Sequence, residues 1–140
     1  MGADFVALIP SESAGMAYSH VHTMRSKLIK MVSPELGEIF NKNSWTSPNG
    51  LVFDTVAQRY DLVIQGLTQM LEKTGSEVIA GVLAFVNHSD CDGEFYGEDC
   101  ANILKALRQL KDNGDDDVAT ENLINVFDDA VRGNGIVAVW

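Results

Sequence analysis

The sequence predicts a mainly α (α+β) fold: a single helical domain over residues 1–140, with a small sheet that pairs strands near its two ends. Short β-branched runs bounded by glycine or proline lie near both ends, ADFVALIP at 3–10 and GIVAVW at 135–140. Almost everything between them repeats apolar residues at helical spacing. No linker, internal repeat or low-complexity tract divides the chain, so we expect one domain.

A first helix is predicted after the N-terminal strand, where four apolar residues recur at helical spacing. Ser33 and Pro34 then supply the N-cap and the first position of a short helix that runs through Phe40. A third, longer helix is predicted from a more regular series of apolar residues at helical spacing. The first helix is marked by Tyr18, Val21, Leu28 and Val32, and the third by Val56, Tyr60, Ile64, Leu67 and Leu71.

The connection before the long helix predicts a turn. In WTSPNGL at 45–51, Pro48 presets its own φ and Gly50 accepts a positive φ. Asp54 can then cap the long helix, because its side chain can accept from the free backbone amides of the first turn. Gly75 separates the long helix from the next one.

The second half of the chain predicts a central helix and two more. SEVIAGVLAFVN at 76–87 is apolar nearly all the way round, so we expect it to be the central core helix. KDNGDDD at 111–117 interrupts the helical pattern, and Gly133 ends the final helix. The core-facing residues are Ile103, Leu104, Leu107 and Leu110 before the interruption, and Leu123, Ile124, Phe127, Ala130 and Val131 after it.

The net charge of −10 is concentrated in the last third of the chain. Residues 1–86 hold six basic and eight acidic side chains, whereas residues 87–140 hold four basic and twelve acidic ones. Direct nucleic-acid binding is not expected, because it needs a basic footprint that displaces counterions. A protein partner with a basic surface, or a cation, is the better expectation. The simpler alternative is an acidic face that only keeps the protein in solution.

We expect a soluble cytoplasmic protein without membrane association. No basic N-terminal region precedes an apolar stretch, and the longest apolar run is too short to cross a bilayer. In that compartment Cys91 and Cys100 are expected to be reduced thiols. Their closeness in sequence leaves a redox role open.

The strongest candidate site is NHSDCDGEFYGEDC at 87–100. With His88 as position 1, carboxylates fall at positions 3, 5, 7 and 12, Gly93 at 6 and Phe95 at 8, which is the spacing of an EF-hand loop. An apolar helix is expected to enter and an amphipathic helix to leave, with Phe95 facing the core. The candidate ligands for Ca²⁺ or Mg²⁺ are His88, Asp90, Asp92, Glu94, Glu98 and Asp99.

Three departures from the EF-hand pattern predict weak binding. His88 stands in place of the first aspartate, Asp99 in place of the final bidentate glutamate, and Tyr96 offers no carboxylate at position 9. A second loop is not found, because KDNGDDDVATEN at 111–122 puts a lysine at position 1 and an aspartate at position 6. The alternative is a metal-free turn whose Asn87, Asp90 and Asp92 side chains hydrogen-bond backbone donors and cap the next helix.

Zinc is disfavoured. His20, His22, His88 and Cys91 are the candidate ligands, but His20 and His22 lie in a predicted helix, where residues two apart point to nearly opposite sides. We expect His22 to be partly buried beside Tyr18 and His20 to lie on the surface.

Catalysis is also disfavoured. Cys91 and His88 resemble a nucleophile and its base, but the surrounding carboxylates would raise the thiol pKa. The pair Asp115 and Asp117 is more simply a solvated turn. A hydrolase could still hold Mg²⁺ through Asp90, Asp92 and Asp99.

The motif FVNHSDCDGE, followed by a helix, resembles one found in uncharacterised bacterial and bacteriophage proteins that open with M-G-x-D-F; here the opening is MGADF. YSHVHTMRSKL is similar to an early helix of that group, and DDAVRGNGIVAVW to its closing helix and strand. The resemblance implies no particular activity. It implies a bacterial or viral source and a distinguishing site formed by His88, Asp90, Cys91, Asp92 and Gly93.

The function favoured by these observations is a non-enzymatic, acidic protein-interaction module with a weak Ca²⁺- or Mg²⁺-binding loop at 88–99. An alternative is a phage-type inhibitor that mimics DNA and occupies a host DNA-binding or defence enzyme. A metal-dependent hydrolase is the third possibility. A line of carboxylates spaced like phosphates would favour the DNA mimic.

Overall fold

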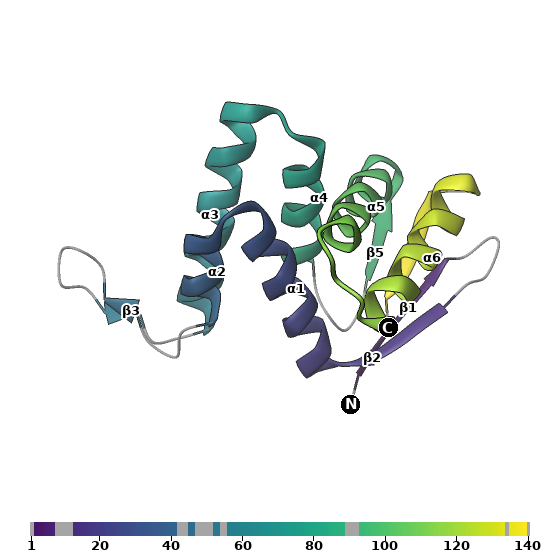
Figure 1. The fold of residues 1–140 in the computed structure, drawn as a ribbon, viewed down its shortest axis with the longest axis horizontal. Helices are drawn as coiled ribbons and strands as arrows, with labels where there is room; N and C mark the ends of the chain where they lie inside the picture. Colours follow the sequence, from purple (N-terminus) through teal and green to yellow (C-terminus); the bar gives the residue numbers. More distant parts are fainter. Residues whose placement is uncertain are drawn as a thin grey trace.

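The computed structural model describes residues 2–7, 13–41, 45–46, 52–53, 56–88, 93–133 and 135–139. This part of the chain is mainly helical with a small antiparallel sheet, which confirms the predicted fold class (Figure 1). The helices are α1 (Tyr18–Val32), α2 (Pro34–Asn41), α3 (Val56–Thr74), α4 (Glu77–Val86), α5 (Gly97–Asp112) and α6 (Val118–Arg132). The strands are β1 (Gly2–Ala7), β2 (Ser13–Ala17), β3 (Trp45–Thr46), β4 (Val52–Phe53), β5 (Gly93–Tyr96) and β6 (Ile136–Val139).

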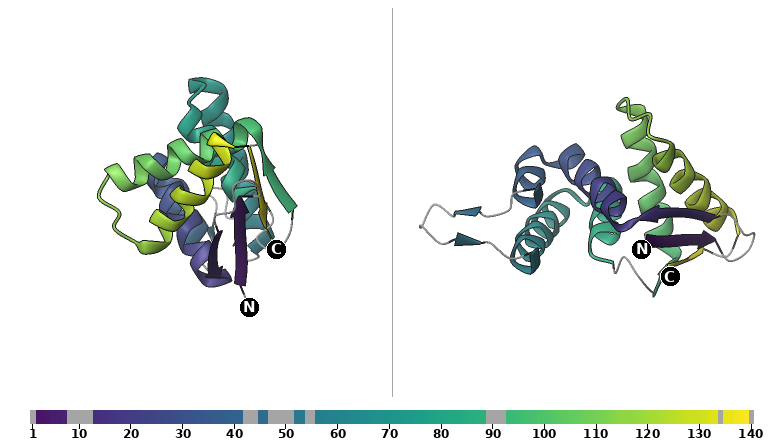
Figure 2. Two further views of the ribbon diagram at one scale, coloured as in Figure 1. Left: turned by 90° about the vertical axis from the view of Figure 1, so that its right-hand side faces the viewer. Right: turned by 90° about the horizontal axis from the view of Figure 1, so that it is seen from below.

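The main sheet has four antiparallel strands in the order β2-β1-β6-β5. β1 and β6 pair in its middle, with Phe5 opposite Val139, which confirms that the two predicted terminal strands pair. The sequence pattern does not predict β2 or β5, because SAGMA lacks β-branched residues and GEFY is too short to show alternation. Helix α6 packs on β1, β2 and β6, and α5 contacts β5 and β6, so both helices lie on one side of the sheet (Figure 2).

The predicted helix ends follow from local chemistry. The Ser33 hydroxyl accepts a hydrogen bond from the Leu36 amide at 3.2 Å, and Pro34 begins α2, so this cap is confirmed. Gly75, at φ +63°, separates α3 from α4. The predicted cap Asp54 and residues 47–51 of the predicted turn lie outside the described residues; the flanking strands β3 and β4 pair with each other.

Two core assignments need correction. Among the α3 side chains that the structure describes, Val63 and Leu67 are fully buried, whereas the predicted stripe residues Tyr60, Ile64 and Leu71 are half-buried. On α6, Val131 is 42% exposed in the last turn of the helix, although Ile124, two turns earlier, is buried.

Helix α4 is central, as predicted, because it contacts α1, α3 and α5. Four phenylalanines, one each from β1, α4, β5 and α6, form an aromatic cluster. Ring centroids are 5.9 Å apart for Phe5 and Phe85, 6.5 Å for Phe5 and Phe95, and 6.2 Å for Phe85 and Phe95. Phe127 of α6 meets Phe95 edge-to-face at 5.5 Å. The cluster therefore ties the sheet to the helices on its covered face.

None of the helices in the described residues combines the length and the apolar character that a bilayer crossing requires.

Candidate functional site

The predicted metal loop at 88–99 contains a strand and the first turn of a helix. Gly93 begins β5 and adopts φ +106°, a backbone conformation that favours glycine. Phe95 is 3% exposed, which confirms that it faces the core. Its backbone lies in β5 and is paired with β6, opposite Val137, instead of with a second loop.

His88 closes this segment on itself. Its ring stacks on Phe95 with centroids 3.9 Å apart, and its Nε2 donates to the Glu94 carbonyl at 3.0 Å. A Cβ on Gly93 would lie 3.2 Å from the same ring, which is a tight contact, so glycine leaves room for the histidine. These contacts give His88 a structural role in addition to any role as a ligand.

The remaining described ligand candidates are exposed. The Glu94 carboxylate accepts a hydrogen bond from the Tyr96 hydroxyl at 3.1 Å, and this bond raises the pKa of Tyr96. Glu98 and Asp99 lie in the first turn of α5, where the helix dipole favours negative charge. No three histidine, cysteine or carboxylate side chains in the described ranges converge as metal ligands. Asp90 and Asp92 lie outside those ranges, so the Ca²⁺ or Mg²⁺ site stays a prediction.

The zinc candidates on α1 diverge, as expected for residues two apart on a helix. His22 is exposed and stacks on Phe40 with centroids 4.6 Å apart, so the expectation that it is partly buried was wrong. His20 turns to Asp117.

Cys100 is buried inside the fold as a free thiol. Its Sγ lies 3.4 Å from the Phe95 carbonyl and 3.2 Å from the Gly135 carbonyl. Burial raises the pKa of this thiol to about 11, so it is protonated at neutral pH and a poor nucleophile. Cys91, the other half of the suggested redox pair, lies outside the described residues.

Sequence reasoning missed the buried residue Arg25. Its guanidinium donates to the Tyr60 hydroxyl at 3.0 Å and to the His88 carbonyl, so it joins α1, α3 and the end of α4. Its Nε has no hydrogen-bond partner within the part of the chain that the structure describes. One signal could have found it, because Arg25 lies on the apolar stripe between Val21 and Leu28.

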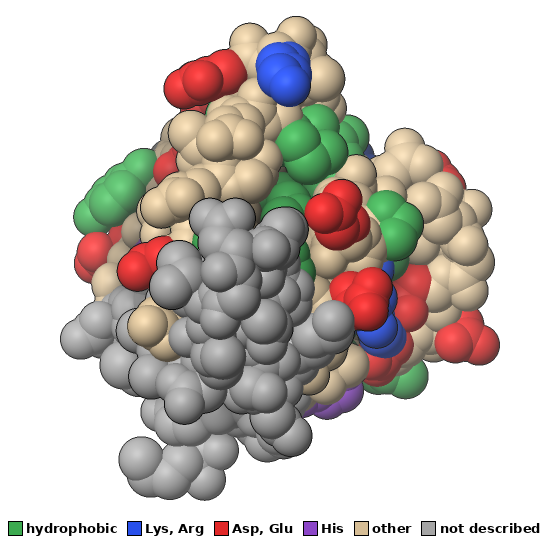
Figure 3. Space-filling view, turned by 90° about the vertical axis from the view of Figure 1, so that its left-hand side faces the viewer, with side chains coloured by type: hydrophobic (Ala, Val, Ile, Leu, Met, Phe, Trp, Pro, Cys, Tyr) green, Lys and Arg blue, Asp and Glu red, His purple; other side chains and the backbone are tan. Residues whose placement is uncertain are grey.

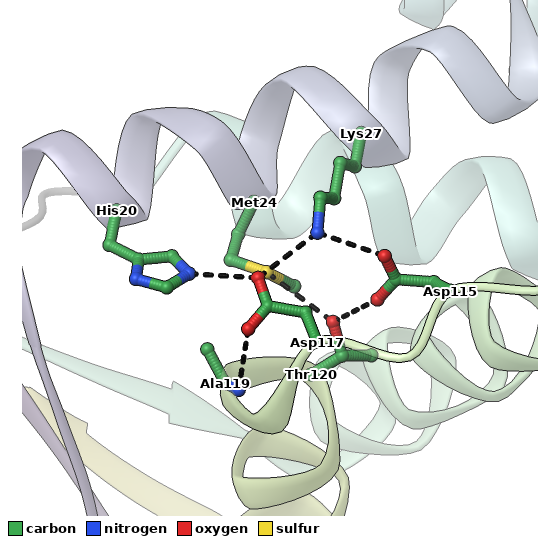
Figure 4. Close-up of polar contacts among 7 residues, drawn as sticks. All are labelled: His20, Met24, Lys27, Asp115, Asp117, Ala119 and Thr120. Carbon is green, nitrogen blue, oxygen red and sulfur yellow. Dashed lines mark hydrogen bonds and ion pairs between the residues drawn. The ribbon is translucent and has the colours of Figure 1, made fainter.

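A second polar cluster joins α1 to the α5–α6 turn (Figure 4). Asp117 accepts hydrogen bonds from His20 Nε2 at 3.0 Å, from Lys27 Nζ at 3.0 Å and from the Ala119 amide at 3.0 Å. Lys27 also donates to Asp115 at 2.8 Å. The prediction that 115–117 is only a solvated turn was wrong, because α1 supplies partners about 90 positions away in sequence.

The contacts within this cluster shift the pKa values of its ionisable side chains. The Ala119 amide, followed by His20 and Lys27, holds the pKa of the Asp117 carboxyl well below its usual range. Burial acts to raise the pKa of Asp115, but the hydrogen bonds from Lys27 and Thr120 together lower it. Burial acts to lower the pKa of Lys27, and the two carboxylates outweigh this and raise it. All three groups therefore stay charged at neutral pH and hold α6 against α1.

We expect the Asp117→Asn variant to lose about 1 kcal/mol of unfolding free energy at pH 7, because the amide can still cap α6 but carries no charge. A carboxyl whose pKa is lowered by folding contributes stability above its unfolded pKa, near 4, and loses it as pH falls further. The variant should therefore lose less stability than the native chain between pH 5 and pH 3, measured by urea unfolding.

The neighbouring Asp116→Asn change is the control, because Asp116 is exposed and has no ion pair among the described residues. It should change stability by less than about 0.5 kcal/mol. Identical acid sensitivity of Asp117→Asn and the native chain would contradict the role assigned to this carboxylate.

Comparisons of the chain with protein-family models, with curated proteins and with solved structures found no match. The resemblance of the FVNHSDCDGE segment to bacterial and bacteriophage proteins therefore stays a prediction.

Proposed function

We propose that the chain is a non-enzymatic, acidic protein-interaction module whose C-terminal third binds a basic surface of a partner protein in the cytoplasm. The observation that carries this proposal is the pairing of charges. Within 93–133, every basic side chain is already in an ion pair with a carboxylate of the same chain: Lys105 with Glu77, Arg108 with Asp128, Lys111 with Glu121, and Arg132 with Asp128 and Asp129.

Five carboxylates of this segment are left over. They are exposed and have no ion pair among the described residues: Glu94, Glu98, Asp99, Asp112 and Asp116. On the face shown in Figure 3, acidic side chains are spread over both sides of the described surface, and hydrophobic side chains are scattered among them. A surface of this kind favours a cationic partner through complementary charge.

The same ion pairs favour this function over DNA mimicry. Arg108 and Lys111 lie on the α5–α6 surface between the two ends of α5 that carry the unpaired carboxylates. A mimic of the phosphate backbone needs a continuous line of negative charge, and these cations interrupt it.

The proposal includes a weak Ca²⁺ or Mg²⁺ ion held by Asp90 and Asp92 with other oxygens of the 88–99 segment. Such an ion would stiffen the connection between α4 and α5 and so present the acidic side chains in a fixed arrangement. Calorimetric titration of metal-stripped protein should give sub-millimolar to millimolar affinity, lost in Asp90→Ala. Tight zinc binding, or no binding of either ion, would overturn this part.

The interaction proposal is tested with a fluorescent lysine homopolymer and a glutamate homopolymer of equal length. Anisotropy should show binding of the lysine peptide alone, weakening as salt rises from about 50 to about 300 mM. The triple change Glu98→Gln, Asp112→Asn and Asp116→Asn should weaken binding roughly fivefold, because each exposed ion pair contributes well under about 1 kcal/mol.

A matched triple separates a specific surface from net charge. Asp4→Asn, Glu35→Gln and Asp61→Asn are exposed and remove the same three charges from other elements. This triple should weaken binding by less than about twofold. Equal losses in the two triples would mean that overall charge attracts the peptide and that the acidic third is no binding surface.

A further inference from the structure

Helix α4 is apolar on all sides, but the fold covers only part of it. Ile79, Val82 and Phe85 are buried against the core, with exposures of 8%, 0% and 1%. Ala80, Leu83 and Ala84, on the opposite side, stay half-buried. A helix that is apolar on all sides is normally buried on all sides, whereas this face is only partly covered in the described structure.

That face forms the wall of a groove of about 340 Å³. Leu71 of α3 faces the α4 residues Ala80, Leu83 and Ala84 across it, and His88 and Asp99 lie at its β5–α5 end. Because most of these side chains are half-buried, the groove is shallow and open to solvent. It is near the lower limit of small-ligand pockets, at roughly 300 Å³, and suits a few apolar side chains presented by another chain.

The two segments that form the groove are acidic in composition. The two segments that form it, 71–88 and 93–99, contain five acidic residues and one basic residue, Lys73. One of the acidic side chains, Glu77, pairs with Lys105. Asp99 lines the groove itself, is exposed and has no ion pair among the described residues. An apolar groove with the Asp99 carboxylate at one end complements an amphipathic segment that carries apolar side chains and a cation.

We propose that this groove binds an amphipathic, basic helix of the partner protein, with its apolar face against α4 and a lysine or arginine beside Asp99. The inference rests on the proposed function and adds where the partner docks and which kind of segment it offers. Apolar burial supplies affinity, whereas the Asp99 carboxylate favours a basic partner and sets its orientation.

The experiment uses two labelled peptides of identical leucine and lysine composition. In one, the leucines lie on one helical face; in the other, the order is scrambled so that no face forms. The amphipathic peptide should bind at least about tenfold more tightly, because only it can place leucines together in the groove. Backbone amide shifts in an NMR titration should locate the contact at Leu71, Ala80, Leu83 and Ala84.

Groove-filling variants test the contact directly. Ala80→Gln and Ala84→Gln each add a neutral, bulky side chain, and should weaken the amphipathic peptide about tenfold without affecting the scrambled one. Val118→Gln is the control, because Val118 is 71% exposed and lines a different hollow. Urea unfolding checks that the variants fold. If a variant does not fold, the NMR titration of the native chain still shows where the peptide binds.

The role of the Asp99 carboxylate in peptide binding is tested by two single substitutions on α5. Asp99→Asn should weaken the amphipathic peptide about threefold, whereas Asp112→Asn, at the other end of α5, should change it by less than about twofold.

Equal binding of the two peptides, or NMR shifts centred on 114–121, would contradict the groove as the docking site and would leave the proposed function unaffected. Absence of binding by both peptides and by the lysine homopolymer would overturn the proposed function as well.

Discussion

Replacing Gly81 by alanine is expected to lower the free energy of unfolding by about 3 kcal/mol, although alanine is the better helix former by about 1 kcal/mol. A Cβ at position 81 would lie 2.1 Å from the Asn102 carbonyl oxygen and 2.8 Å from the Ile103 nitrogen. Both atoms belong to the backbone of α5, so no side-chain rotation relieves the overlap. Helices α4 and α5 would have to move apart, and the contact between them is the most extensive between any two of the described elements. Urea unfolding followed by circular dichroism measures the loss.

Gly66→Ala is the matched control, because Gly66 is also inside a helix. A Cβ there would meet the tip of the Leu36 side chain at 2.7 Å, and that side chain can move. The change in stability should therefore stay within about 1 kcal/mol of the native chain. If Gly81→Ala is as stable as Gly66→Ala, the close approach of α4 and α5 is incorrect.

Phe95→Ala should cost about 4 kcal/mol, within the range for truncating a buried aromatic residue. Phe95 contacts three other rings of the aromatic cluster and carries the His88 ring on its remaining side. Its loss would open a cavity where β5, α4 and α6 meet, and would free the segment that begins at His88. Urea unfolding gives the size of the effect.

Tyr96→Ala is the control on the same strand. Tyr96 points to the opposite side of β5 and is 56% exposed, so its truncation should cost less than about 0.5 kcal/mol. Similar losses for the two variants would show that β5 does not place alternate residues on core and solvent sides as described.

Local patterns predicted the elements of this fold well, because caps and periodicity depend on nearby residues. Ser33 and Pro34 begin α2, Gly75 separates α3 from α4, and Gly133 follows the last residue of α6. The pairing of β1 with β6 was also foreseen, since two short apolar strands near opposite ends need partners. Strand β5 was not, because a metal-loop spacing and a short strand use the same residues, GEFY.

The candidate sites depended more on contacts between distant segments. Phe95 faces the core as the loop spacing predicts, since this depends on the adjacent apolar elements. His20 and Asp117 are 97 positions apart in sequence, and nothing in either segment indicates the other. Arg25 was overlooked because its partners come from α3 and from the end of α4.

The sequence by itself determined the helices, the terminal strands and the acidic character of the last third, because these depend on composition and on spacing along the chain. Only the tertiary structure decided which carboxylates are paired and which side of α4 remains uncovered. The physical reason is that ion pairing and burial depend on which elements meet in space. A uniformly apolar helix such as 77–86 carries no mark of the side its neighbours will leave open.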